Sequence, residues 1–128
     1  MLPLALVLAA VAGLLHVVFF LMESVLFRRP EVHRRFGTRS ADVDAVRPWA
    51  FNQGFYNLFL AAGAFVGVGL AAAGVTDVGL ALLLLSCGSM VGAALVLVAT
   101  DRRMARAALL QGLIPALAVV ASILALGS

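Results

Sequence analysis

Four long apolar runs, separated by polar segments, dominate the pattern along the chain. Each run is close to the ~20 residues that a helix needs to cross a hydrocarbon core about 30 Å thick. Backbone polar groups in lipid must be satisfied internally, and the runs lack the alternation of barrel strands. The pattern therefore predicts an all-α fold, a single four-transmembrane-helix antiparallel bundle over residues 1–128. The expected helices cover residues 2–27, 50–73, 78–99 and 107–126, with a loop at 28–49.

The composition supports a membrane location. Hydrophobic residues make up 64% of the chain and charged residues 12%, whereas soluble domains contain roughly 45–50% and about 25%. A soluble fold of 128 residues has no interior large enough for that much apolar surface. We therefore expect a multi-pass protein with membrane lipids as its immediate partners.

The basic residues outside the two histidines are all arginines, and they fall in two clusters. Because basic loops favour the cytoplasmic side, both clusters are expected there, with both termini and the loop around Thr76 on the extracytoplasmic side. The arginines flank apolar runs and form no broad basic surface, so no nucleic-acid partner is expected. The clusters are Arg28, Arg29, Arg34, Arg35, Arg39 and Arg47 in the first loop, and Arg102, Arg103 and Arg106 in the third.

Local signals add detail to the loops and to helix packing. Residues 40–44 predict a short capped helical turn with acids near its start, and Pro48 suits the first turn of helix two. Two G-x-x-x-G pairs predict close packing, either within the bundle or in a homo-oligomer. These pairs are Gly63 with Gly67 and Gly88 with Gly92.

Glu23 is the only charged residue inside any of the apolar runs, and His16 lies seven residues before it. Seven residues are nearly two helical turns, so both side chains are predicted on one face, about 10 Å apart in depth. An ionisable group within a span normally faces the bundle interior and marks a functional site. A structural alternative is that Glu23 reaches the interface or pairs with Arg28 or Arg29. For His16, the alternative is a purely structural hydrogen bond between helices.

Helix two opens with an unusually polar segment. Two i, i+4 pairs, Asn52 with Tyr56 and Gln53 with Asn57, form adjacent polar stripes. Gln53 and Asn57 require polar partners inside the bundle, which a ligand site or simple interhelical hydrogen bonding would each supply.

The predicted topology places these groups at similar depth. Glu23, the start of helix two and Gln111 at the start of helix four all fall in the cytoplasmic half, and His16 would form a floor near mid-bilayer. The outer halves of the helices are almost wholly apolar. Pro115 is expected to kink helix four and free a carbonyl near Gln111. Together these features predict a blind polar pocket that opens toward the cytoplasm.

Several kinds of chemistry are excluded by absent motifs. Cys87 is the only cysteine, so no internal disulfide and no paired-cysteine metal motif is expected. No phosphate-binding glycine loop, H-E-x-x-H motif or nucleophile elbow is present. Of the two histidines, His33 falls in the soluble loop, so one chain offers no bis-histidine haem site within the bundle. We expect no cofactor and no metal.

A set of motifs is spread across nearly the whole chain. They are His16, Met22-Glu23, the loop residues Pro30 and Arg34 to Gly37, the block Asn52 to Asn57 with Phe59 to Gly63, and Gln111-Gly112 with Pro115-Ala116. In these motifs the chain resembles the DUF1304 family of small bacterial membrane proteins, although Phe27 stands where the family usually has a tryptophan. This resemblance implies a four-span fold in the bacterial inner (plasma) membrane and supplies no reaction.

Three functions follow from this reading. The first is a cofactor-independent enzyme or binding protein for a lipophilic, oxygen-bearing small molecule, with Glu23 as general acid or base and His16 as its partner. The second is a small proton-coupled, multidrug-type transporter that works as a dimer, and the third is a structural or assembly subunit. In the first, the substrate contacts are expected from Asn52, Gln53, Tyr56, Asn57 and Gln111.

Overall fold

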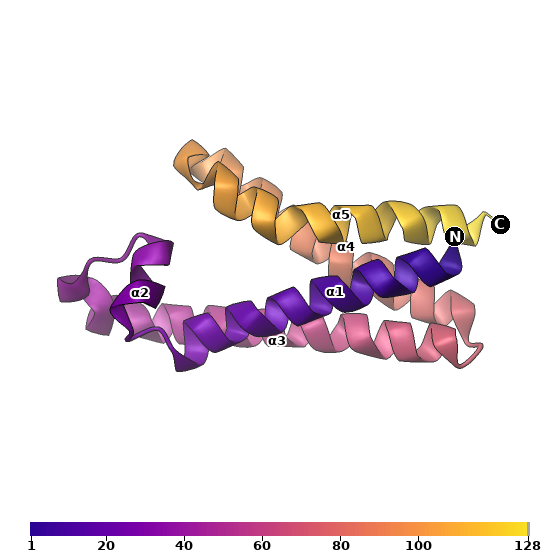
Figure 1. Ribbon diagram of the computed structural model, residues 1–128, viewed down its shortest axis with the longest axis horizontal. Helices are drawn as coiled ribbons and strands as arrows, with labels where there is room; N and C mark the ends of the chain where they lie inside the picture. The colour runs from indigo at the N-terminus through magenta and orange to yellow at the C-terminus, as the bar shows by residue number, and fades with distance from the viewer. Residues whose placement is uncertain (128) are drawn as a thin grey trace. The chain divides into compact units, whose positions relative to one another are not determined.

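The computed structural model describes residues 1–127 and contains four long helices, as the apolar pattern predicts (Figure 1). All four are long and apolar enough to cross a membrane, and no strand occurs in the described residues. Short helical turns fill much of the first loop. The long helices are α1 (Leu2–Phe20), extended by the π-helix η1 (Leu21–Val25), α3 (Val43–Ala72), α4 (Thr76–Thr100) and α5 (Ala105–Leu126). The short ones are α2 (Pro30–His33), η2 (Arg34–Phe36), η3 (Ser40–Asp42) and η4 (Arg102–Met104).

The second long helix begins earlier than its apolar run. α3 starts at Val43, so Pro48 lies inside the helix, and its predicted place in the first turn is wrong. The polar residues before position 50 continue the helix because they include acids suited to its first turn, such as Asp44. The predicted turn at residues 40–44 is present as η3, but Ser40 does not cap it, since Arg39 occupies the N-cap position without a side-chain hydrogen bond.

The chain forms two compact units. Unit 1 comprises Met1–Leu15 and Leu60–Ser128, and unit 2 comprises His16–Phe59. The long helices α1 and α3 each contribute a part to both units. Whether the chain acts as one domain stays a prediction.

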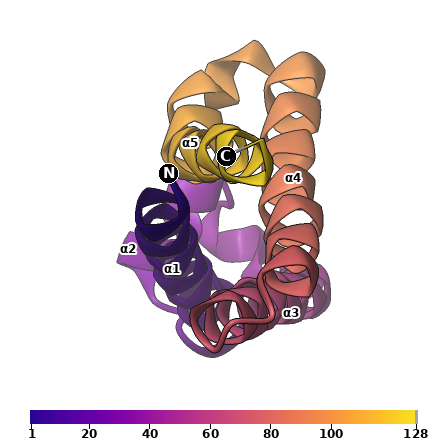
Figure 2. The same cartoon turned by 90° about the vertical axis from the view of Figure 1, so that its right-hand side faces the viewer.

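Unit 1 is a four-helix bundle with a core of small and aliphatic side chains. Seen along the helices, the first part of α1, the end of α3, α4 and α5 surround one centre (Figure 2). The start of α1, the end of α5 and the turn between α3 and α4 lie at the same end of this unit (Figure 1). The buried core consists of Ala9, Ala12, Ala64, Leu80, Leu83, Cys87, Met90 and Ala118.

The two G-x-x-x-G pairs behave differently. A Cβ atom at Gly67 would lie 2.9 Å from the carbonyl oxygen of Gly79, and one at Gly63 would collide with the Ser86 side chain, so this pair packs α3 against α4. At Gly88 and Gly92 a Cβ atom would meet nothing within 4 Å. Within the described residues the second pair therefore makes no close contact with another helix, so only the homo-oligomer alternative of the prediction applies to it. Their contact in a homo-oligomer stays a prediction.

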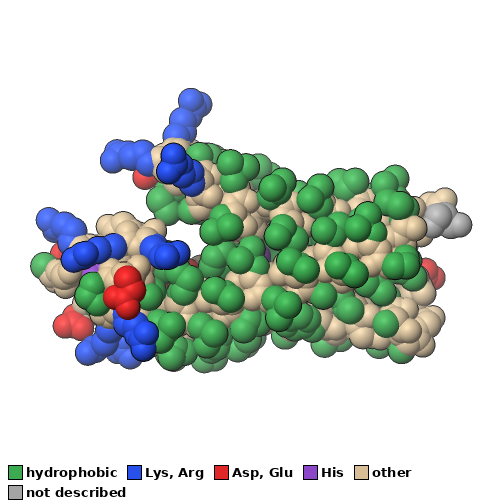
Figure 3. Space-filling view, in the orientation of Figure 1, with side chains coloured by type: hydrophobic (Ala, Val, Ile, Leu, Met, Phe, Trp, Pro, Cys, Tyr) green, Lys and Arg blue, Asp and Glu red, His purple; other side chains and the backbone are tan. Residues whose placement is uncertain are grey.

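The molecular surface suits a lipid environment. Hydrophobic side chains cover most of the helices, and arginines gather at helix ends (Figure 3). Leu85, Leu95 and Leu109 are each more than 60% exposed, a state that lipid tails satisfy and water does not. Pro115 lies inside α5, whose ribbon bends part-way along its length (Figure 1).

Candidate functional site

The end of the first span is wound as a π-helix. η1 covers Leu21–Val25, and the amide of Leu26 donates to the carbonyl of Leu21, 2.8 Å away, which closes an i→i+5 turn. Single π-turns inside α-helices are frequently found at functional sites. Here the turn carries Glu23 and Ser24, which are both buried.

A glycine lets α3 approach this turn closely. A Cβ atom at Gly54 would collide with the Ser24 side chain and would lie 3.0 Å from the Ser24 amide nitrogen and 3.1 Å from the Glu23 Cβ. The Ser24 hydroxyl donates to the carbonyl of Phe51 at 2.8 Å. Phe51, Gly54 and Asn57 are spaced three residues apart, so they share one face of α3. This face holds the π-turn in place.

The carboxylate of Glu23 has one hydrogen-bond partner, an amide. Asn57 Nδ2 donates to Glu23 Oε2 at 2.6 Å, and the side chains are only 9% and 6% exposed. Within residues 1–127 no basic side chain forms an ion pair with Glu23. Arg28, which the alternative interpretation paired with Glu23, instead lies 3.3 Å from Asp44. Oε1 accepts no hydrogen bond from the described residues.

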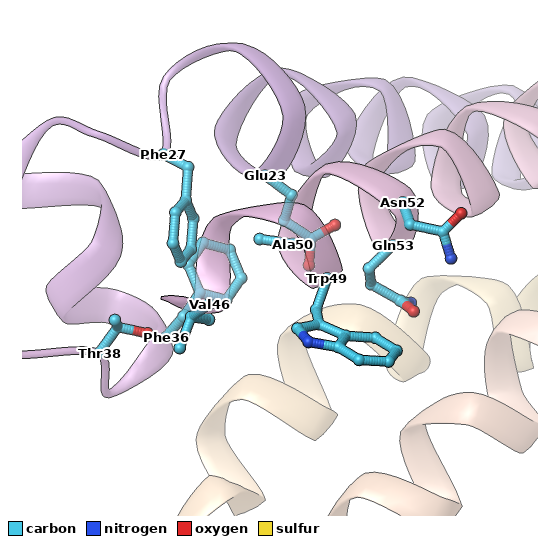
Figure 4. A pocket seen from close by; sticks show the side chains of 9 residues that line it. All are labelled: Glu23, Phe27, Phe36, Thr38, Val46, Trp49, Ala50, Asn52 and Gln53. Carbon is cyan, nitrogen blue, oxygen red and sulfur yellow. The ribbon is translucent and has the colours of Figure 1, made fainter. Parts of the chain in front are cut away.

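Glu23 lines a cavity of about 310 Å³ within unit 2 (Figure 4). This volume is at the lower end of the range for small-molecule sites. Asn52 and Gln53 from α3 line it beside Glu23, and the aromatic side chains Phe27, Phe36 and Trp49 form much of the remaining wall. Thr38, Val46 and Ala50 complete the lining.

The first loop folds back over the π-turn and supplies part of this wall. Gly37 has φ +70°, a left-handed conformation that suits glycine and ends η2. His33 is buried beside Phe27, with ring centroids 6.4 Å apart, and its Nε2 lies 3.2 Å from the Ser40 hydroxyl. The packed loop brings Phe36 against Phe27 at 5.9 Å.

Arginine and aspartate side chains also pair with each other within the first loop. Arg39 Nε donates to Asp42 Oδ2 at 2.8 Å on the exposed side of the loop. This hydrogen bond and the carboxylate charge raise the pKa of the Arg39 guanidinium above its ordinary value. Arg39 and Arg28 each neutralise a nearby acid, and no arginine lines the cavity.

The structure brings some of the expected site residues together. Glu23, Asn52 and Gln53 line the cavity. Asn57 is not part of the lining, but it donates a hydrogen bond to Glu23. His16 is fully buried on α1 and packs edge-on against Phe19 with ring centroids 5.4 Å apart, but it does not line the cavity.

Two further expected residues lie outside this cavity. Tyr56 is 57% exposed on α3 and is absent from the lining. Gln111 lies half-buried on α5, in unit 1. Their contact with a ligand, like that of His16, stays a prediction.

Several contributing residues were missed by sequence reasoning. Ser24 looked like an ordinary small residue, although its position beside Glu23, with Gly54 and Asn57 one turn apart in helix two, was a usable signal. The aromatic wall was harder to predict, because Phe36 and Trp49 both fall within the predicted loop at 28–49. The π-turn carries no composition signal at all.

No cluster of three or more metal-binding side chains occurs among the described residues. The site is instead one buried carboxylate with amide neighbours and an aromatic wall. Such a group suits hydrogen bonding, charge pairing or proton transfer.

The fold and the site together define a class: an all-α, multi-pass membrane protein with a buried carboxylate near the end of its first span. The chain belongs to the family described as "Protein of unknown function (DUF1304)", which it matches over residues 10–123. This match confirms the family that the sequence motifs indicated. Comparison with curated proteins and with solved structures found no match.

Proposed function

We propose that the protein binds a small lipophilic molecule in the cavity of unit 2, with Glu23 as the polar anchor. The observation that carries this proposal is the state of the carboxylate. It is nine-tenths buried, one oxygen accepts a hydrogen bond from Asn57, and no basic side chain among residues 1–127 forms an ion pair with it. A buried acid costs several kcal/mol in a membrane, so one that does not hold the fold together through an ion pair is expected to serve a ligand.

The surroundings of Glu23 support a role in chemistry as well as binding. An acid that is held by one amide and lines a cavity with both polar and aromatic walls is suited to general acid–base catalysis without a cofactor. Asn52 and Gln53 add hydrogen-bonding groups to the same lining. The Arg-rich first loop belongs to the same unit, and the positive-inside rule therefore supports a cavity at the cytoplasmic side.

Co-purification tests this proposal. Protein purified from membranes in mild detergent is extracted with organic solvent, and the extract is analysed by mass spectrometry. We expect a small molecule bound at about one per chain in the wild type and lost in Glu23→Gln. Asp77→Asn, which changes an acid of α4 in unit 1, is the control and keeps the molecule.

The fold of each variant is checked independently. Cys87 is fully buried in the core of unit 1, so its thiol stays unreactive toward a maleimide dye while that core is intact. A folded Glu23→Gln protein that retained the same molecule would contradict the proposal.

A further inference from the structure

The cavity of unit 2 combines one negative charge with an aromatic wall. Glu23 is the only ionisable side chain in its lining. Phe27 is 2% exposed, so its ring is fixed in the fold, and its centroid lies 5.9 Å from that of Phe36 at an interplanar angle of 42°. Trp49 lies on the other side of the Glu23 carboxylate from these two rings (Figure 4).

This combination of groups selects for a cation. The faces of aromatic rings carry partial negative charge and attract ammonium ions within about 6 Å, and methylated ammonium groups are recognised in this way. A carboxylate such as that of Glu23 adds a full negative charge, which compensates the positive charge of a bound ammonium ion. A bound cation pairs with the ionised form of Glu23, whereas a neutral apolar molecule offers the Glu23 carboxyl group neither a charge nor a hydrogen bond.

The protein's own cations do not fill this role. Arg28 lies against Asp44 and Arg39 against Asp42, and no arginine reaches the cavity lining. The cavity of about 310 Å³ lies at the lower end of the range for small-molecule sites, which favours a small occupant.

We propose that this cavity binds a small organic ammonium ion, with Glu23 as its counter-ion and the rings of Phe27, Phe36 and Trp49 around it. The inference rests on the proposed function and narrows its ligand to a chemical class. The charged nitrogen lies next to Glu23 Oε1, the oxygen that Asn57 does not bind. The apolar part of the ligand packs against the rings.

Benzyltrimethylammonium and neopentylbenzene, which have the same shape but differ in charge, test the proposal on the protein in lipid vesicles. Trp49 is the only tryptophan, so its emission reports binding at this site without labelling. We expect saturable binding of the cation to the wild type, and an affinity for the neutral analogue at least about tenfold lower. The two compounds partition into the lipid to the same extent whichever variant is present. A difference in apparent affinity between variants therefore reports binding at the cavity.

Two substitutions separate the charge from the rings. In Glu23→Gln the side chain still accepts a hydrogen bond from Asn57, and we expect the preference for the cation to disappear. In Phe36→Leu we expect binding of the cation to weaken about threefold to tenfold, with little change for the neutral analogue. Phe59→Leu, an exposed aromatic outside the cavity, leaves both affinities unchanged.

The outcomes distinguish this inference from the function on which it rests. If the wild type bound the two compounds with equal affinity, the proposal that the ligand is a cation would be overturned. The proposed ligand site at Glu23 would not be affected by that result. A cation preference that survives in folded Glu23→Gln would also overturn it. The proposed function itself fails in a different experiment, the co-purification test, if folded Glu23→Gln retains the same bound molecule as the wild type.

Discussion

The two units bury different kinds of group. In unit 1 the helices meet through glycine and alanine, and the core holds aliphatic side chains with Cys87. In unit 2, α3 approaches the π-turn closely at Gly54 and also makes polar contacts with it, through the Ser24 hydroxyl and the pair of Asn57 with Glu23. Close packing of small residues is sufficient to hold membrane helices together. A buried acid is not a usual part of such packing, and this contrast is the reason that the proposed function is placed in unit 2.

Each unit carries its own reporter, so the comparison is directly measurable. Cys87 is the only cysteine and lies in the core of unit 1, and Trp49 is the only tryptophan and lies in unit 2. Thiol labelling during heating follows the opening of unit 1, and tryptophan emission follows changes in unit 2.

The largest effect is expected from Gly79→Leu in unit 1. A Cβ atom at this position would lie 2.6 Å from the Ala71 nitrogen and 2.7 Å from the Gly67 carbonyl oxygen, and main-chain atoms cannot move aside. We expect a loss of about 3 kcal/mol in the free energy of unfolding, measured by Cys87 labelling on heating. Gly88→Leu in the same helix has open space and is the control. Equal stability of the two variants would contradict the packing of unit 1.

Gly54→Leu makes the equivalent change in unit 2. The new side chain would push α3 away from Ser24 and Glu23, at a cost of about 1–3 kcal/mol. We expect altered Trp49 emission and loss of the ligand-dependent change. Gly69→Leu lies in the same helix with nothing within 4 Å and should match the wild type. Normal ligand binding by Gly54→Leu would argue against the close approach at the π-turn.

Asn57→Leu removes the donor that fixes Glu23. A hydrogen bond to a charged group is worth about 1.5–3 kcal/mol, and the carboxylate would lose its only partner among the described residues. We expect lower thermal stability and weaker ligand binding. Asn52→Leu, which is exposed on the same helix, should not change the stability. If the two variants unfolded alike, the pair of Asn57 and Glu23 would not be a buried contact.

The smallest effect is expected from Arg28→Gln. The ion pair with Asp44 is exposed, with side chains 67% and 87% accessible, and such pairs contribute about 0–1 kcal/mol. We expect almost no change in stability or in ligand binding. A large loss of binding would revive the alternative in which Arg28 compensates Glu23, and would remove the contrast between the two units.

Much of this fold was predictable, because four runs of apolar residues leave few alternatives to a helical bundle. The helix starts were less accessible. Polar residues such as Asp44 look like loop, although they extend α3 to Val43. The distinction between the two G-x-x-x-G pairs depends on which helix face meets a neighbour, and the motif itself is the same in both cases.

For the site, the sequence singled out Glu23 and Asn57 as separate candidates, because a lone charge and a polar helix start stand out in apolar runs, but it did not show that the two side chains pair. It did not identify the wall around them. Phe36 reaches the cavity because Gly37 ends η2 in a left-handed conformation and the loop folds back. Trp49 reaches it because α3 begins early and places residue 49 within a helix. Both depend on tertiary structure that no local pattern encodes.

The most direct test of the account is carbodiimide labelling of Glu23 in nanodiscs, read residue by residue by mass spectrometry. Dicyclohexylcarbodiimide is an apolar reagent that reacts with carboxyl groups reached from a hydrophobic environment. The account predicts labelling at Glu23 in preference to Asp77 and the acids of the first loop, and protection of Glu23 by benzyltrimethylammonium. A Glu23 side chain that is unreactive, or equally reactive with and without the cation, would contradict it.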